Sequence, residues 1–305
     1  MLRTENLTKK YGSFTALDCL TLSIESGKLH GFVGPNGAGK TTTMRILATL
    51  LPATSGSAYI DGVDVAREPR RVREMVGYMP DFFGVYDGLK VYEYLDFYGS
   101  CCGLPYKERT RMAGQLLELV ALTDKRDAYV DTLSRGMKQR LCLARSLIHD
   151  PSLIILDEPA SGMDPRARAE MKGILRTLKE LNKTVLISSH ILPELSEICD
   201  SLSIMDHGRL IFSGGIDALA QHMHRESPLV IRVSGDSGEA VRLLQESEGV
   251  TGIEITEDGA LQTVFAGDAA ALLRRLVTGG VAVSDFHRAP VNLETVFMEV
   301  TGHDA

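Results

Sequence analysis

One short run of residues has the composition of a phosphate-binding loop. It reads Gly34-Pro35-Asn36-Gly37-Ala38-Gly39-Lys40-Thr41, with Thr42 next, and it matches the pattern G-x-x-x-x-G-K-[ST]. In this pattern the glycines let backbone N–H groups turn toward a polyphosphate. Lys40 places a positive charge near the β and γ phosphates, and the Thr41 hydroxyl can hold Mg²⁺. By itself, the run predicts a nucleoside triphosphatase or a kinase.

The segments beside this loop are the ones that would position it. Leu29 to Val33 is a short apolar run that predicts a strand, and Met44 to Leu51 predicts an apolar helix. A loop between such elements would place a bound phosphate at the amino end of the helix, where backbone N–H groups are free. This context favours a phosphate site over a chance match.

Two adjacent carboxylates follow another apolar run. Asp157 and Glu158 come directly after Leu153-Ile154-Ile155-Leu156. Asp157, at the tip of this predicted strand, could hold Mg²⁺ directly or through water, and Glu158 is the natural general base for water that attacks a γ-phosphate. Two acids at a strand end can also be a solvated loop, but the phosphate loop upstream favours the catalytic interpretation.

Alternating strands and helices predict the architecture of residues 1–220. Ser152 to Leu156 and Thr184 to Ser188 read as short strands, and the helix between them has Asp164 as its N-cap and Pro165 at its first position. Such alternation indicates an α/β fold with a largely parallel sheet covered by helices. A helical insert is expected at about residues 88–148. Four aromatic residues of the insert can form either local core or a docking surface. They are Tyr92, Tyr94, Phe97 and Tyr98.

Length, charge and cysteine content narrow the class of protein. A chain of 305 residues is long enough for two domains. The net charge of −7 argues against a dedicated nucleic-acid binder, which would usually be basic. The five cysteines match no zinc or disulfide spacing, which favours reduced thiols. No secretory leader is recognised, so secretion is not expected. No apolar run approaches roughly 18–20 residues, so no membrane span is expected.

The C-terminal residues predict a separate module. A polar linker at 221–227 precedes residues 228–305, whose strands and helices follow the order β-α-β-β-α-β of a small ferredoxin-like domain. The expected elements are strand 229–233, helix 238–245, strands 252–255 and 261–265, helix 269–277 and strand 281–286. A final helix is expected at about 293–300. This module carries no catalytic constellation.

A motif upstream of the paired carboxylates carries a family resemblance. The run Leu133-Ser134-Arg135-Gly136-Met137-Lys138-Gln139-Arg140 starts a helix with Ser134 as its N-cap, and it resembles the L-S-G-G-Q signature of ABC ATPases. Residues 1 to about 220 resemble that family as a whole. Further family marks occur in the same order along the chain: Tyr11 at the adenine-stacking position, Asp81 in the Q-loop, Ser161 to Asp164 as the D-loop and His190 as the switch histidine.

Three positions depart from the family pattern. Arg135 and Met137 replace the usual Gly and Gln of the signature, whereas Ser134 and Gly136, which would meet the γ-phosphate, are kept. Asp81 replaces the usual Gln of the Q-loop. Its carboxylate can approach Mg²⁺ or its waters, or it can mainly couple the nucleotide site to a partner. These variants resemble the exporter-type subgroup of daunorubicin-resistance and sodium-extrusion ATPases.

The resemblance implies a P-loop ABC ATPase core with a helical subdomain, followed by a small C-terminal α+β domain. The ligands would be ATP and Mg²⁺. The implied nucleotide contacts are Tyr11, the loop 34–42, Asp81, Ser134, Gly136 and Asp157. Thr41, Asp157 and Asp81 would hold the metal. Lys40, Glu158 and His190 would be catalytic.

The resemblance also implies partners. Two copies would pair head to tail, with each ATP between the phosphate loop of one copy and Ser134 and Gly136 of the other. The chain would energise a separate integral-membrane permease, in the direction of export, from the cytoplasmic face of the cell membrane. It would be soluble when isolated, with no nucleic acid bound and no lipid insertion of its own. The cargo and the permease stay open.

Three other functions are weighed against this one. A soluble ABC ATPase that acts on ribosomes or DNA would usually have two cassettes, long coiled coils or zinc modules, which the sequence lacks. A GTPase would need Asn-Lys-x-Asp, whereas residues 182–185 read Asn-Lys-Thr-Val. A regulatory subunit with weak turnover is disfavoured by the intact set of Lys40, Asp157, Glu158 and His190.

Overall fold

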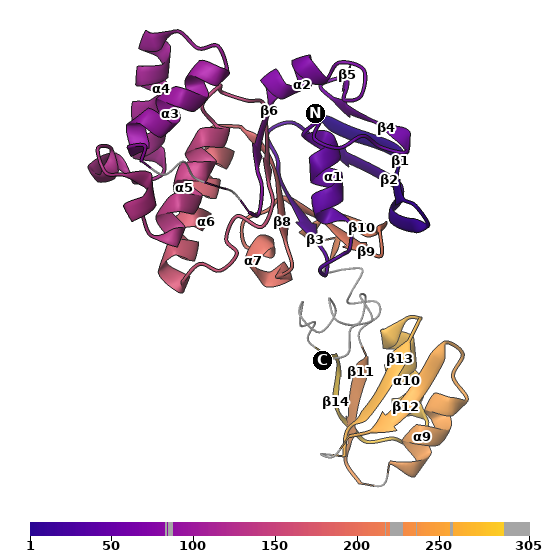
Figure 1. Ribbon diagram of the computed structural model, residues 1–305. Coiled ribbons are helices and arrows are strands. Elements are labelled where there is room, and N and C mark those ends of the chain that lie inside the picture. Colours follow the sequence, from indigo (N-terminus) through magenta and orange to yellow (C-terminus); the bar gives the residue numbers. More distant parts are fainter. Residues whose placement is uncertain are drawn as a thin grey trace. The chain divides into compact units, whose positions relative to one another are not determined.

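The structure is a computed structural model that describes residues 1–82, 84, 88–216, 218–219, 228–235, 237–256 and 259–289. The chain divides into two compact units, Met1–Ile216 and Asp217–Ala305 (Figure 1). The predicted linker 221–227 and the predicted final helix 293–300 lie outside the described residues. Among the residues that are described, no helix is both long enough and apolar enough to cross a bilayer.

A six-stranded sheet forms the centre of the first unit. Its order is β10-β9-β3-β8-β7-β6, and all neighbours run parallel except the antiparallel pair of β9 and β10. The strands are β3 (Leu29–Val33), β6 (Val76–Met79), β7 (Leu153–Leu156), β8 (Thr184–Ser189), β9 (Ser201–Asp206) and β10 (Arg209–Gly215). Every residue of β3 and β7 is buried, which explains their unbroken apolar runs. The predicted α/β fold with a largely parallel sheet is confirmed.

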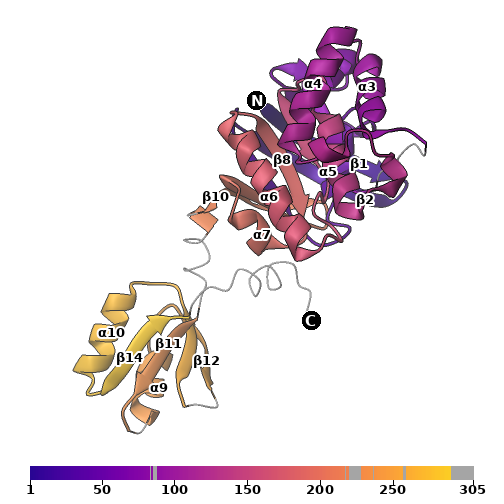
Figure 2. The ribbon, with the colours of Figure 1, turned by 90° about the vertical axis from the view of Figure 1, so that its left-hand side faces the viewer.

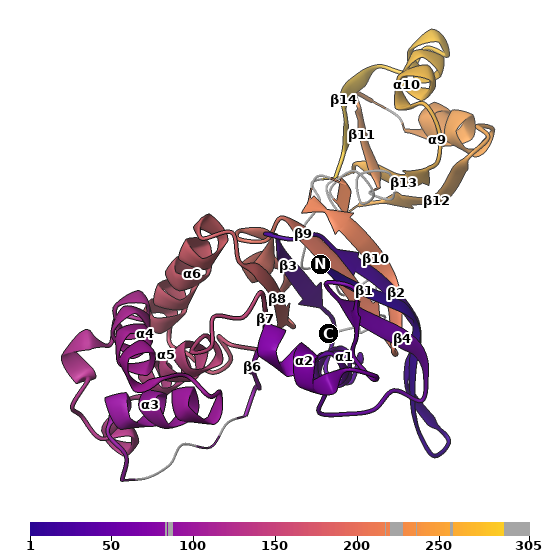
Figure 3. The same ribbon diagram turned by 90° about the horizontal axis from the view of Figure 1, so that it is seen from above.

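Helices cover both faces of this sheet (Figure 3). On one face α1 (Lys40–Leu47) packs Met44 into the same core cluster as Phe32 of β3. Because side chains alternate along a strand, Gly31 faces the other side, where an added Cβ would lie 3.1 Å from Leu195 of α7. The other helices that the structure describes in the first unit are α2 (Pro69–Met75), α3 (Val91–Cys101), α4 (Tyr106–Leu119), α5 (Arg135–Ser146), α6 (Pro165–Glu180) and α7 (Leu192–Ser196), with single 3₁₀ turns at Thr123–Lys125 and Val130–Thr132.

The first unit also contains an antiparallel sheet that the sequence did not predict. Its order is β2-β1-β4-β5. The strands are β1 (Leu2–Tyr11), β2 (Phe14–Ile24), β4 (Ser55–Ile60) and β5 (Val63–Asp64). Apolar residues of this sheet, such as Leu17 and Ile60, share one core cluster with α1. The helix that follows the phosphate loop is therefore packed between two sheets.

The helix α1 ends earlier than the sequence predicts. It ends at Leu47 rather than at Leu51. Thr49 adopts a left-handed φ of 62°. The N–H of Thr49 donates to the Ile46 carbonyl at 3.0 Å, and the N–H of Leu50 donates to the Arg45 carbonyl at 2.8 Å. This pair of bonds is the Schellman arrangement, which closes a helix with one left-handed residue.

The aromatic residues of the helical segment from α3 to α5 differ in burial. Tyr94 is fully buried and forms local core. Phe97, one turn further along α3, is 44% exposed. Tyr98 stacks edge-on to both rings, at centroid distances of 4.9 Å from Tyr94 and 5.3 Å from Phe97. The cluster therefore anchors α3 on one side and leaves an aromatic surface on the other.

The second unit is a four-stranded antiparallel sheet with two helices (Figure 2). Its elements are β11 (Leu229–Val233), α9 (Gly238–Gln245), β12 (Val250–Ile255), β13 (Leu261–Phe265), α10 (Ala269–Thr278) and β14 (Val283–Arg288), and the sheet order is β12-β13-β11-β14. Leu244 of α9 and Leu276 of α10 share a core cluster with Ile231 and Leu261. This is the predicted ferredoxin-like order. β12 begins two residues earlier than predicted, and β14 lies two residues later.

A buried histidine in β3 gives the first testable prediction. His30 is held between two hydroxyls, with Nδ1 2.7 Å from Ser201 Oγ and Nε2 2.8 Å from Ser203 Oγ. Burial lowers the pKa of His30 to about 4 from its ordinary 6.5. The unfolded chain therefore binds this proton more readily, and the stability contribution is complete above about pH 6.5 and falls as the pH drops toward 4. The full loss is about 3 kcal/mol.

The measurement is the free energy of unfolding in urea between pH 4.5 and 7.5. We expect His30→Gln to show a shallower dependence on pH than the wild type. The matched control is His207→Gln, because the His207 side chain is exposed. Equal pH slopes for the wild type and His30→Gln would contradict the prediction.

Candidate active site

The phosphate loop joins the end of β3 to the start of α1, as predicted. Gly37 and Gly39 have φ values of 86° and 101°, which only glycine adopts without strain. At Gly34 an added Cβ would lie 2.5 Å from the Met205 carbonyl oxygen, so the loop can pass β9 only without a side chain there. Since α1 begins at Lys40, its free N–H groups open into the loop. The segment thus has the shape of an anion-binding turn.

The side chain of Lys40 folds back into this loop. Its Nζ donates to the carbonyls of Gly34 at 2.5 Å and Pro35 at 3.1 Å, and the residue is 6% exposed. Burial lowers the pKa of Lys40, and the nearby carboxylates of Glu158 and Asp157 oppose that shift. The ammonium group therefore lies inside the loop and next to the acid pair.

Asp157 is completely buried at the carboxyl end of β7. Its Oδ1 accepts hydrogen bonds from Thr41 Oγ1 at 3.1 Å and from Ser188 Oγ at 2.8 Å. Its Oδ2 is buried and has no hydrogen-bond partner among the described residues. Burial raises the pKa of Asp157, the Ser188 and Thr41 hydrogen bonds lower it, and the charge of Asp81 raises it further. A buried oxygen without a partner is costly unless something binds it.

Glu158 follows in a strained conformation. Its φ is 50°, in the left-handed region that a residue with a side chain adopts only at some cost in free energy. The N–H of Glu158 donates to Ser188 Oγ at 2.9 Å, and His190 Nδ1 lies 3.0 Å from Glu158 Oε2. Glu158 Oε1 is buried and lies 3.7 Å from Lys40 Nζ. The carboxylate is therefore held between a histidine and a lysine.

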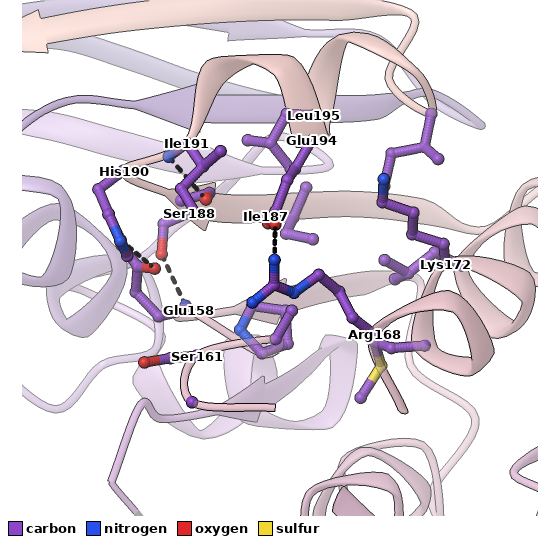
Figure 4. Close-up of a pocket in the computed structure, with 17 residues that line it drawn as sticks. Glu158, Ser161, Arg168, Lys172, Ile187, Ser188, His190, Ile191, Glu194 and Leu195 are labelled. Carbon is purple, nitrogen blue, oxygen red and sulfur yellow. Dashed lines mark hydrogen bonds and ion pairs between the residues drawn. The ribbon is translucent and has the colours of Figure 1, made fainter. Parts of the chain in front are cut away.

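A cavity of about 100 Å³ opens beside Glu158 and His190, between α6, α7 and β8 (Figure 4). Arg168 of α6 spans it. Its Nη1 pairs with Glu194 of α7 at 2.7 Å, and its Nη2 donates to the Met163 carbonyl at 3.4 Å. This ion pair fixes the helix after the Ser161–Asp164 loop to the helix that follows His190.

The structure places the remaining predicted residues as follows. Tyr11 ends β1 and is 49% exposed, with Lys9 Nζ 5.1 Å from its ring centroid. Asp81 is exposed just after β6, the neighbour of β7, and its negative charge raises the pKa of Asp157. Ser134 caps α5, because its Oγ accepts from the Met137 N–H at 3.3 Å. Gly136 lies where an added Cβ would be 2.9 Å from Ala167 Cβ.

The predicted residues fall into two groups. Lys40, Thr41, Asp157, Glu158 and His190 are joined by direct contacts. In the part of the chain that the structure describes, no hydrogen bond or ion pair joins Ser134 or Gly136 to the phosphate loop. Sequence reasoning gave no role to Ser188, which bonds both Asp157 and the Glu158 backbone. Its position two residues before His190 was the only available signal.

A phosphate loop with a buried aspartate and an adjacent glutamate beside it defines a P-loop nucleoside triphosphatase. The sequence profile described as "ABC transporter" matches residues 17–161. The chain is 36% identical to the Nod factor export ATP-binding protein I of Ralstonia nicotianae, over 100% of this chain and 94% of that protein. It is 34% identical to the daunorubicin/doxorubicin resistance ATP-binding protein DrrA of Streptomyces peucetius, over 100% and 93%.

Solved structures agree with these relatives. The ATP-binding subunit of an ABC transporter superposes with a TM-score of 0.66 at 28% identity, over 73% of this chain and 92% of that one. A dimeric bacterial ABC transporter cassette superposes with a TM-score of 0.65 at 24% identity, over 71% and 99%, and shows the fold alone. The chain therefore belongs to the ABC transporter family, as an ATP-binding protein of exporter type, and it is an ATPase. The predicted family is confirmed.

Proposed function

We propose that ATP hydrolysis by this chain drives export through a separate membrane-spanning permease. The proposal rests mainly on one observation. At the carboxyl ends of β3, β7 and β8 the structure brings together four residues: Lys40, Asp157, Glu158 and His190. The names of the relatives, a Nod factor export protein and a drug-resistance protein, support the direction of export. The cargo would be chosen by the permease.

The first unit is proposed as the nucleotide-binding domain, with residues 88–148 as its helical subdomain. The N–H groups of residues 34–42 would bind the phosphates, and the half-exposed ring of Tyr11 would stack on adenine. Lys40 would face the β and γ phosphates. The C-terminal unit would be an accessory domain without a catalytic role.

The residues around Asp157 fit a magnesium ion. Mg²⁺ prefers oxygen ligands, and the buried, partnerless Oδ2 of Asp157 supplies one beside the Thr41 hydroxyl. Thr41 and Asp157 would hold the ion, and Asp81 would be a further oxygen ligand. Bound Mg²⁺ would neutralise negative charge on the phosphates.

Glu158 is proposed as the general base. The oxygen of a water molecule attacks the γ-phosphorus, the bond from phosphorus to the ADP oxygen breaks, and the proton of the water passes to the Glu158 carboxylate. Because an ionised carboxylate only accepts hydrogen bonds, His190 Nδ1 carries the hydrogen in their contact. His190 thereby orients Glu158, and Lys40 stabilises the charge that develops on the phosphates.

A second copy of the chain is proposed to complete each site. Ser134 and Gly136 make no contact with the phosphate loop of their own chain among the described residues, yet they form the exposed start of α5. In a head-to-tail pair they would meet the γ-phosphate of ATP held by the partner copy. Through the permease, such a pair would lie at the cytoplasmic face of the membrane, without lipid insertion or nucleic acid.

Two assays test this function. The purified chain should hydrolyse ATP with a specific activity that rises with protein concentration, and neither ribosomes nor DNA should stimulate it. The chain should also sediment with membranes only when it is co-expressed with its permease, and we expect a gene beside its own to encode that hydrophobic protein. Stimulation by ribosomes or DNA, or a constant specific activity at all dilutions, would contradict the proposal.

Asp81 gives a prediction about the metal. We expect Asp81→Gln to raise the Mg²⁺ concentration needed for half-maximal ATP hydrolysis roughly tenfold, with little change in the rate at saturating Mg²⁺, because an outer ligand is lost while Asp157 and Thr41 stay. Asp131→Asn, on the exposed turn before α5, is the control. An unchanged Mg²⁺ requirement would assign Asp81 to partner coupling instead.

A further inference from the structure

Two side chains of α5 donate hydrogen bonds to the loop between Glu158 and α6. Arg135 Nη2 donates to the Ser161 carbonyl at 3.2 Å, and Gln139 Nε2 donates to the same oxygen at 3.0 Å. Together these donors occupy both lone pairs of one carbonyl oxygen. The contact is notable because Arg135 stands where the family signature has glycine, so a glycine there could not make it.

The guanidinium of Arg135 also fills the space beside Gly162. An added Cβ on Gly162 would lie 2.4 Å from Arg135 Cζ and 2.5 and 2.6 Å from its two terminal nitrogens. Gly162 has a φ of 65°, which a residue with a side chain would adopt only under strain. Arg135 and Gly162 are therefore a matched pair, in which the large residue needs the absence of a side chain on the small one.

Ser161 is connected to the catalytic Glu158 by a tight turn. The N–H of Ser161 donates to the Glu158 carbonyl at 3.0 Å. Figure 4 shows Glu158 and Ser161 on the same side of the cavity, with His190 next to Glu158. If Arg135 moved, the Ser161 carbonyl that it binds would move with it, and the turn that joins Ser161 to Glu158 would then shift the Glu158 backbone. At its other end, Arg135 lies between Ser134 and Gly136.

We propose that Arg135 is a positioning residue that couples the two nucleotide sites of the paired chains. It ties Ser134–Gly136, which would contact the ATP of the partner copy, to the turn that carries the chain's own Glu158. Closure of one site would then set the position of the base in the other. This inference rests on the proposed two-copy function, because only in that arrangement do the two ends of Arg135 belong to different nucleotides.

The test is steady-state ATP hydrolysis by the full chain as a function of ATP concentration. We expect the wild type to show a Hill coefficient above 1, with an upper limit of about 2 for two coupled sites. Arg135→Ala should bring the coefficient close to 1 and lower kcat roughly tenfold, with the thermal unfolding midpoint unchanged. Arg135→Lys keeps a donor for the Ser161 carbonyl and should recover part of the cooperativity.

The matched control is Lys138→Ala. Lys138 lies one turn further along α5, and its Nζ donates to the Asp131 carbonyl at 3.0 Å, away from the loop. This variant should keep the cooperativity of the wild type. Gly162→Ala is a second variant that perturbs the same contact, because its Cβ would displace the Arg135 guanidinium. The double variant Arg135→Ala/Gly162→Ala should then lose less than the product of the two single losses in kcat.

The outcomes separate this inference from the function on which it rests. A specific activity that is constant at every dilution would remove the two-copy site itself. A wild type whose activity depends on concentration, but whose Hill coefficient is 1 or is unchanged in Arg135→Ala, would overturn only the coupling. Fully multiplicative losses for Arg135→Ala and Gly162→Ala would also overturn it, as would a lower kcat that accompanies a lower unfolding midpoint with the cooperativity intact.

Discussion

Replacing Glu158 by glutamine is expected to lower ATP turnover by about 10²–10³-fold while ATP still binds. Glutamine has the same shape and can still accept the hydrogen bond that His190 Nδ1 gives to Glu158 Oε2. It cannot take the proton of the attacking water. The strained φ of 50° is equally costly for both residues, so the loop should keep its conformation.

Single-turnover hydrolysis and nucleotide binding measure this effect separately. Hydrolysis would normally separate the two copies of the chain. Because hydrolysis is blocked in this variant, the ATP-bound dimer should accumulate, and sedimentation would detect it. Glu180→Gln, at the exposed end of α6, is the matched control and should hydrolyse ATP at the wild-type rate. A normal rate in Glu158→Gln would remove Glu158 as the base.

The second large effect is expected for Lys40→Met. Methionine keeps the apolar stem inside the loop but loses the ammonium group, which binds two loop carbonyls and lies 3.7 Å from Glu158. Without this charge, the γ-phosphate would enter a site that contains two carboxylates and no lysine. We expect turnover to fall by about 10²–10³-fold and ATP affinity to fall as well.

Titration with a fluorescent ATP analogue, together with the hydrolysis rate, tests this prediction. Lys28→Met, on the exposed turn before β3, is the control for the loss of one lysine. The thermal unfolding midpoint of Lys40→Met should stay near that of the wild type, so that a folding defect can be told apart. Wild-type affinity and rate together would rule out the phosphate contact of Lys40.

The pKa shifts of Lys40 and Asp157 share one physical cause. Lys40 and Asp157 are both buried, and burial shifts the pKa of Lys40 down and that of Asp157 up. Each shift disfavours the charged form. Both groups therefore favour a bound ligand of opposite charge, phosphate for Lys40 and a cation for Asp157, because such a ligand replaces the lost hydration.

Local patterns were sufficient for the elements whose identity depends on neighbouring residues. The apolar runs of β3 and β7, the N-caps Ser134 and Asp164, and the strand and helix order of the second unit could all be read from the sequence. Each depends on periodicity or on hydrogen bonds within a few residues. The phosphate loop is equally local, because its shape is set by its own glycines.

The tertiary structure alone decided what depends on distant partners. β1 pairs with β2 through a local hairpin at Gly12 and Ser13, but it also pairs with β4, which lies beyond α1 in the chain, and this second pairing has no local signature. Ser188 meets Asp157, and Arg135 meets Ser161, only because β7, β8, α5 and α6 pack side by side. Sequence spacing fixes which groups are available, whereas packing fixes which of them touch. The residue types and their spacing therefore predicted the chemistry of this chain, whereas the contacts between residues far apart in the sequence required the tertiary structure.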